Sequence, residues 1–294
     1  MNSVKTVLLL GLMSGLLLVG GEAIGGRQGL EWGLMLAIGM NFFSYFFSDK
    51  LALMSYAAQP VTPEENPEVY ARLNPLVGAL CRRMGLPMPK LWLLPDESPN
   101  AFATGRDPQH ASVACTAGIL RLMNDRELEG VLAHELGHVL HRDILISSIA
   151  ATLASAITFL ARMAFWFGPR HDDEDERGNM WSGLLMMVLA PIAGMLIQMA
   201  ISRTREFSAD EASAKYTGDP QALINALGKL ERGVERFPMT DASPATAHMF
   251  ILNPFGADGL TRMFSTHPST EERIARLQAM MERPLPRGYV APSA

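Results

Sequence analysis

The stretch VLAHELGHVLHRD, residues 131–143, is followed directly by ILISSIAATLASAITFLARMAFWFG, residues 144–168. The first stretch sets three histidines among apolar residues, a pattern that predicts a packed helix able to hold a metal ion. The second stretch is 25 residues long and carries one charged side chain, Arg162. About 20 apolar residues suffice to cross a bilayer, so a candidate metal site lies directly before a candidate membrane span.

The apolar residues gather in a few windows of the chain. Of the 294 residues, 48% are apolar, and the net charge is −5. The windows poor in charge are residues 4–20, 30–47, 144–168 and 183–201, whereas charged residues fill 49–143 and 202–294. This distribution is typical of an integral membrane protein with a soluble catalytic or binding part. No basic run with interleaved aromatic residues occurs, so the composition gives no reason to expect a nucleic-acid partner.

The two N-terminal windows predict a helical hairpin. Residues 4–21 and 30–47 each approach the length of a membrane span, and the segment between them is short and polar. An alternative is a signal peptide, since Lys5 precedes the first apolar run and small residues follow it.

The two later windows, residues 144–168 and 183–202, predict a second hairpin. Two features leave open that it is partly embedded or packed on protein. Arg162 lies near the end of its first arm, and Pro191 interrupts its second arm.

The charges next to the predicted spans indicate how the chain is oriented. Lys50, Arg142, Arg203 and Arg205 lie close to span ends on one side, and the positive-inside rule places that side in the cytoplasm. The acidic loop GPRHDDEDERGNMWS, residues 168–182, then lies outside. Two cysteines, at positions 81 and 115, fall in the cytoplasmic part, where we expect small apolar core residues; one disulfide is arithmetically possible.

The segments between the spans predict a mainly α-helical fold with a small β-sheet. An Asn124–Glu127 capping box is predicted to open the helix that carries the histidines. Further helices are predicted over 67–85, 202–216, 221–237 and 269–281, and strands over 90–94 and 111–116 with AFAT, 101–104, between them.

The motif HELGH supplies two candidate metal ligands. His134 and His138 are four residues apart, so both imidazoles lie on one face of a helix and can reach one metal ion. Glu135 lies beside them, where a carboxylate can accept a proton from the attacking water. The alternative is a surface helix with two solvated histidines. The apolar residues that flank the motif favour a packed helix.

A catalytic zinc site needs a third protein ligand. His141 lies about 10.5 Å along the helix axis from His134, too far to share its metal from an unbroken helix. A better source is REFSAD, because Glu206 and Asp210 are four residues apart on a helix. One carboxylate can bind the metal while the other accepts a hydrogen bond from a ligand histidine. A solvated acidic face is the alternative for this pair.

The position of these ligand candidates explains the neighbouring membrane segment. His138 lies shortly before the second predicted hairpin, and Glu206 lies shortly after it. Both ends must reach one metal ion, so the segment between them must cross the membrane an even number of times. We therefore expect the metal site at the mouth of a membrane hairpin, with substrates that come to the membrane surface.

The chain resembles the HtpX-type membrane zinc metalloproteases of bacteria, relatives of the CAAX prenyl proteases. The resemblance covers nearly the whole chain and rests on both hairpins and on the motifs PNAFATG, HELGHVLHRD, REFSAD and STHPSTEERI. It implies a gluzincin-like protease domain with one zinc ion, and endopeptidase activity on membrane-protein or misfolded polypeptide substrates. It also implies protein quality control in the bacterial inner membrane. The chain then divides into a transmembrane hairpin (1–48), a cytoplasmic protease part (49–143), a second hairpin (144–202) and a second cytoplasmic protease part (203–294).

The resemblance also assigns roles to the residues of the predicted metal site. It implies that His134, His138 and Glu206 bind the zinc ion and that Glu135 is the general base. It implies that Asp210 accepts a hydrogen bond from a ligand histidine.

Further roles follow from two other motifs. Asn100 and Ala101 match an edge strand that holds the substrate backbone, although Asn100 also suits a turn after Pro99. His267 matches a position that can donate to the oxyanion, although it equally suits the entry to a helix before Pro268.

Two other functions are compatible with parts of this pattern. A CAAX-type prenyl-peptide protease needs a large enclosed chamber, which four spans are too few to form. A non-catalytic membrane chaperone or adaptor predicts the loss of Glu135 or of a ligand, and all of them are present. The oligomeric state has no signature in the sequence.

Overall fold

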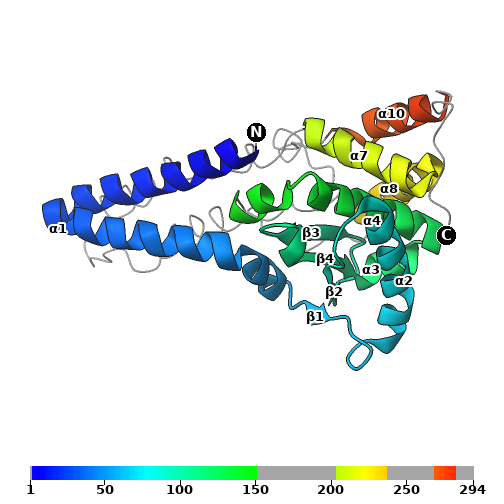
Figure 1. Ribbon diagram of the computed structural model, residues 1–294, viewed down its shortest axis with the longest axis horizontal. Helices are drawn as coiled ribbons and strands as arrows, with labels where there is room; N and C mark the ends of the chain where they lie inside the picture. Colours follow the sequence, from blue (N-terminus) through cyan, green and yellow to red (C-terminus); the bar gives the residue numbers. More distant parts are fainter. Residues whose placement is uncertain (1, 151–202, 237–267, 283–294) are drawn as a thin grey trace, which may run out of the picture.

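The computed structural model describes residues 2–150, 203–236 and 268–282. This part of the chain is mostly helical with one small sheet, which confirms that part of the predicted fold class. Most of the predicted second hairpin, residues 151–202, and His267 lie outside the described residues. The elements in chain order (Figure 1) are α1 (Asn2–Ser55), β1 (Gln59–Pro60), α2 (Pro67–Met84), β2 (Lys90–Leu94), β3 (Ala101–Gly105), β4 (Ala111–Thr116), α3 (Ala117–Leu122), α4 (Asp125–Leu140), α7 (Arg203–Thr217), α8 (Pro220–Arg236) and α10 (Thr270–Glu282).

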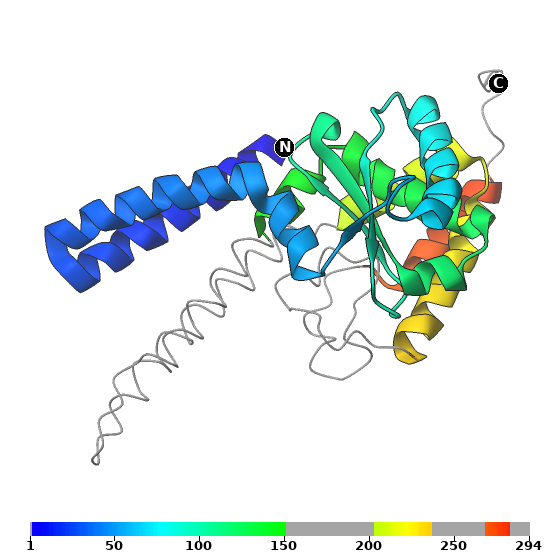
Figure 2. The same ribbon diagram turned by 90° about the horizontal axis from the view of Figure 1, so that it is seen from below.

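Helix α1 folds back on itself and projects from the rest of the chain (Figures 1 and 2). Asn41 Nδ2 donates a hydrogen bond of 2.8 Å to Ser14 Oγ. In a straight helix these residues would lie about 40 Å apart. The turn falls near Gly26, which has a φ of +57°. A side chain on Gly21 would collide with the carbonyl oxygen of Gly29, so these glycines allow the two arms to touch.

One arm of α1 has the length and composition of a membrane span. Among the described residues, Gly26–Phe47 is the one stretch of helix long and apolar enough to cross a bilayer. Thr6–Val19 is apolar but shorter, so two N-terminal spans are not confirmed. The longer arm exposes large apolar side chains that include Trp32, Leu36 and Phe42, each more than half exposed. A continuous apolar surface of this kind is typical of contact with a membrane or a partner.

The sheet carries the strand that borders the candidate site. Its order is β1-β2-β4-β3, with β2 and β4 parallel and the other pairs antiparallel. The predicted strands over 90–94 and 111–116 are confirmed with the same bounds, and AFAT forms β3 together with Gly105. Among the described residues, β3 is an edge strand that pairs only with β4.

Helix α4 lies at the centre of the core. The predicted capping box is present, since the Asn124 side chain accepts from the Glu127 N–H and the Glu127 carboxylate accepts from the Asn124 N–H. The apolar residues of α4 other than Leu140 are buried, and the helix packs against the sheet, α2, α7 and α8. Cys81 and Cys115 are buried, free thiols, as predicted. The helix that carries the histidines is therefore packed, and the alternative of a solvated surface helix is wrong.

Glycines on α4 allow two other helices to approach closely. A Cβ atom on Gly137 would lie 3.1 Å from both Ala209 Cα and Ala212 Cβ of α7. A Cβ atom on Gly130 would lie 3.0 Å from the backbone nitrogen of Leu223 on α8. Larger residues at these positions would push the helices apart. The glycine inside HELGH thus sets the distance between α4 and α7.

We predict that Gly137→Leu lowers the free energy of unfolding by about 1–3 kcal/mol or more, since it overpacks the contact with α7. Gly228→Leu is the matched control. A Cβ atom there meets only the flexible end of Arg232, and leucine favours a helix more than glycine does. Denaturant unfolding of both variants in detergent checks this. Equal stability of the two variants would show that the close approach at Gly137 is unimportant.

Candidate metal centre

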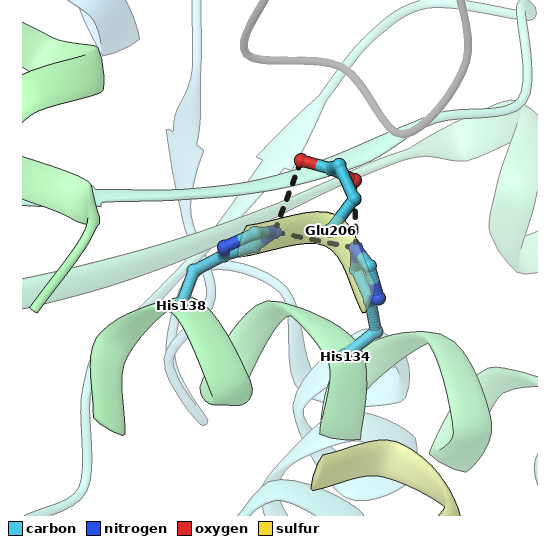
Figure 3. Close-up of side chains that lie close together, drawn as sticks. All are labelled: His134, His138 and Glu206. Atoms are coloured by element: carbon cyan, nitrogen blue, oxygen red, sulfur yellow. Dashed lines mark hydrogen bonds and ion pairs between the residues drawn. The ribbon is translucent and has the colours of Figure 1, made fainter. Parts of the chain in front are cut away.

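Two helices bring three candidate metal ligands together at one point (Figure 3). On α4, the Nε2 atoms of His134 and His138 lie 3.3 Å apart. From α7, the Glu206 carboxylate lies 3.5 Å from His134 Nε2 and 3.7 Å from His138 Nε2. One ligand atom from each residue thus lies within 4.8 Å of the other two.

The spacing and chemistry of this group fit a zinc ion. Nitrogen and oxygen ligands at about 2.0–2.2 Å from a tetrahedral zinc lie about 3.3–3.6 Å from one another. Two imidazoles and one carboxylate form a known set of catalytic zinc ligands that leaves one position open. His134 and Glu206 are buried, and His138 is partly exposed. Solvent therefore reaches the ligand group at His138, whereas His134 and Glu206 are shielded from it.

The surroundings of His134 favour a positive charge at this position. Burial and the nearby Arg273 lower the pKa of His134, but hydrogen bonds to Asp210 and Glu206 outweigh them and raise it to about 9. In the metal-free chain this imidazole therefore holds a proton between two carboxylates. A metal cation bound at Nε2 would meet the negative charge of Glu206 there, while Asp210 stays on the Nδ1 side of the ring.

Asp210 fixes the orientation of His134. Its Oδ1 atom lies 2.9 Å from His134 Nδ1, which leaves Nε2 of the ring facing Glu206. An outer carboxylate of this kind sets both the tautomer and the ring angle of a ligand histidine. Of the two carboxylates that the sequence left as alternatives, Glu206 lies nearer to both Nε2 atoms, and Asp210 lies behind the ring.

Arg273 of α10 holds Asp210 in turn, and reasoning from the sequence missed it. Its Nε and Nη2 atoms donate to the two oxygens of Asp210, at 2.9 Å and 2.6 Å. Both side chains are fully buried. Burial raises the pKa of the Asp210 carboxyl, but Arg273 and His134 lower it to about 2. The available signal was an arginine on the buried stripe of α10, four residues before Leu277.

Glu135 lies between the candidate ligands and the sheet. Its Oε2 atom accepts a hydrogen bond of 2.9 Å from the backbone N–H of Ala103 on β3. Burial raises the pKa of the Glu135 carboxyl, the nearby histidines lower it, and Glu206 raises it further, so that the net direction is upward. A carboxyl with a raised pKa beside a metal site suits proton transfer near neutral pH.

The predicted substrate-binding residues lie where β3 begins. Asn100 is buried, and its Oδ1 atom accepts a hydrogen bond of 2.8 Å from the Ala101 N–H. The N–H groups of alternate residues point to the free edge of β3. Those of Ala101, Ala103 and Gly105 all meet side chains, the last one that of Ser148 at 3.3 Å. The free edge of β3 is thus polar and adjacent to Glu135.

The third histidine of the motif lies apart from the ligand group. His141 is the C-cap residue of α4 and is exposed. The candidate group among the described residues consists of His134, His138 and Glu206. This placement agrees with the helix geometry that argued against His141 as a ligand. His267, the predicted oxyanion donor, lies outside the described residues.

Comparisons with known proteins identify the family to which the chain is similar. The profile of peptidase family M48 matches residues 63–281, which include every described residue of the site. A protease HtpX homolog of Paraburkholderia phytofirmans is 52% identical over 282 residues, which cover 95% of this chain and 97% of the relative. A protease HtpX homolog of Ralstonia pickettii is 51% identical over 283 residues, which cover 96% of this chain and 97% of the relative.

A solved structure shares the fold. The crystal structure of S. mikatae Ste24p matches with a TM-score of 0.51 at 20% sequence identity, over 94% of this chain and 65% of that protein. Similarity at this level of identity shows a common fold and nothing about activity. The family profile and the close relatives carry the assignment: the chain belongs to peptidase family M48 and is a metallopeptidase of the HtpX type.

Proposed function

We propose that this metallopeptidase is a zinc-dependent endopeptidase that holds one zinc ion on His134, His138 and Glu206. We further propose that it cleaves membrane proteins and misfolded polypeptides at the cytoplasmic face of the bacterial inner membrane, in protein quality control. One observation carries the proposal. A His–His–Glu group, buried at His134 and Glu206, lies beside a second glutamate, Glu135, which is held against an edge strand.

The residues around the ligand group can perform the proton transfers of peptide hydrolysis. A bound zinc ion supplies Lewis-acid polarisation of the attacking water and of the peptide carbonyl. Glu135 is placed to accept the proton of that water and to pass it to the leaving amine, because it lies beside both histidines. Asp210 and Arg273 keep His134 in one tautomer throughout.

Strand β3 is suited to hold an extended peptide next to Glu135. A peptide can add to a sheet edge through main-chain hydrogen bonds, and within the described part of the chain β3 is an edge strand in contact with Glu135. The Ala103 N–H donates to Glu135, so a peptide paired with β3 would run past the general base and would replace the side-chain acceptors that now occupy the edge. This placement supports the roles proposed for Asn100 and Ala101 at the start of the strand.

Contacts between α1 and the sheet support a site close to the membrane. The end of α1 buries Ala52 and Leu53 against Leu94 and Phe102, and Phe102 belongs to β3. The helix with the length and composition of a span therefore packs against the strand beside Glu135. Substrates would reach the ligand group from the membrane surface. The basic residues next to the predicted spans support a cytoplasmic orientation.

We predict that Glu135→Gln abolishes proteolysis while zinc stays bound, because the amide cannot accept the proton and Glu135 is not a ligand. Activity should fall by at least about 10²–10⁴-fold. Cleavage of a misfolded membrane protein by the detergent-purified protein is the measurement. It is made in the presence of a chelator and again after zinc is added back. Glu211→Gln, an exposed change of the same kind on α7, should cleave normally. A variant at Glu135 that cleaves at the wild-type rate would refute the mechanism.

The proposed orientation predicts that the loop over residues 168–182 lies outside the cytoplasm. Cys81 and Cys115 are replaced, and a single cysteine is placed at Asn179 or Ser182. A membrane-impermeant thiol reagent should then label intact cells. Labelling that requires lysis would place the loop inside, as expected for a second hairpin that does not cross.

A further inference from the structure

The second candidate ligand histidine also faces an aspartate. His138 Nδ1 lies 3.4 Å from Asp143 Oδ2, and the Asp143 side chain is 4% exposed. On the far side of that carboxylate, Arg205 Nε lies 3.9 Å from Asp143 Oδ1. The arrangement parallels that at His134, where Asp210 contacts the ring and Arg273 contacts Asp210.

The backbone after α4 is shaped to bring Asp143 back to His138. Helix α4 ends at Leu140, and Arg142 adopts a left-handed conformation with a φ of +58°. This conformation is unfavourable for a residue with a side chain, so it persists where the surrounding structure enforces it. The Asp143 N–H then donates a hydrogen bond of 2.9 Å to the His138 carbonyl. The Asp143 side chain is thus held at the Nδ1 side of the His138 ring.

Each of the two nitrogen atoms of the His138 ring has a defined neighbour in this geometry. Nε2 lies among the candidate ligand atoms, 3.3 Å from His134 Nε2 and 3.7 Å from Glu206. Nδ1 faces Asp143. An imidazole that binds a metal through Nε2 carries its proton on Nδ1 and donates it to an outer acceptor.

We propose that Asp143 is a positioning residue for metal binding: it accepts the His138 Nδ1–H hydrogen bond and so keeps Nε2 turned toward the metal, with Arg205 holding its charge. This inference rests on the zinc site proposed above. Asp143 also directly precedes the helical residues 144–150, the start of the predicted second hairpin. The orientation of one ligand is thereby tied to the place where the chain enters that hairpin.

A purely structural role for Asp143 makes a different prediction. Its position before residue 144 also suits the N-cap of that helix, and aspartate, asparagine and serine all cap well. Asparagine can both cap and accept from Nδ1. Serine can cap, but its shorter side chain does not extend to the His138 ring. Asp143→Asn and Asp143→Ser therefore separate the two roles.

The test measures zinc affinity of the purified full-length protein by competition with a chelator. Asp143→Ala and Asp143→Ser should both lose about 10–100-fold in affinity, whereas Asp143→Asn should retain most of it. The visible spectrum of the cobalt(II)-substituted protein, which reports ligand geometry, should change in the serine variant. Asp219→Ser is the control, because Asp219 accepts from the Ala222 N–H at the start of α8, away from the ligand group.

Two results would overturn the inference. If Asp143→Ser binds zinc as tightly as Asp143→Asn does, Asp143 serves helix capping alone. Wild-type affinity and cobalt spectrum in all three variants would show that His138 needs no outer partner. A wild-type chain that binds no zinc would instead refute the proposed zinc site together with this inference, so the two failures are distinguishable. If Asp143→Ala does not fold, the serine and asparagine variants decide alone.

Discussion

The close packing of α4 against α7 is the contact on which the site depends. The two helices are far apart in the chain, and residues 141–202 separate them. Gly137 and Ala209 let their backbones approach, and this approach sets Glu206 opposite His134 and His138. A side chain at position 137 would move one ligand away from the other two. The glycine of HELGH thus serves the metal site without touching it.

Charge compensation is the second requirement of this packing. Glu135, Glu206 and Asp210 are all buried in one small region together with His134. Unpaired buried charges are costly, and removing one partner of a buried ion pair costs about 3–5 kcal/mol. Arg273 offsets Asp210 with two hydrogen bonds from a helix near the C-terminal end of the chain. A metal cation would offset Glu206, so metal binding and the packing of α10 are expected to support the same native arrangement.

Local patterns explain which parts of the fold were predictable. The capping box at Asn124, the strands over 90–94 and 111–116, and the end of α2 at Gly85 all follow from neighbouring residues. The spacing of His134 and His138 likewise predicts their common face. Glu206 and Asp210 were predictable as a pair, but their separate positions depend on the α4–α7 crossing, which no local pattern specifies.

Arg273 and Asp143 were missed for a related reason. Arg273 reaches Asp210 across the core from another helix, and Asp143 returns to His138 through a left-handed residue at position 142. The first contact depends on tertiary packing, and the second depends on a conformation that arginine rarely adopts. The predicted span over residues 4–21 stays a prediction, because the apolar helical stretch found there, Thr6–Val19, is shorter than a span.

The central claim is that ligands on either side of the 144–202 segment share one zinc ion. It is tested most directly by the zinc content of two purified full-length variants. The account predicts that Glu206→Gln loses most of its zinc, since a carboxylate ligand becomes an amide, whereas His141→Ala retains about one zinc per chain. Equal zinc loss in both variants, or loss only with His141→Ala, would contradict it.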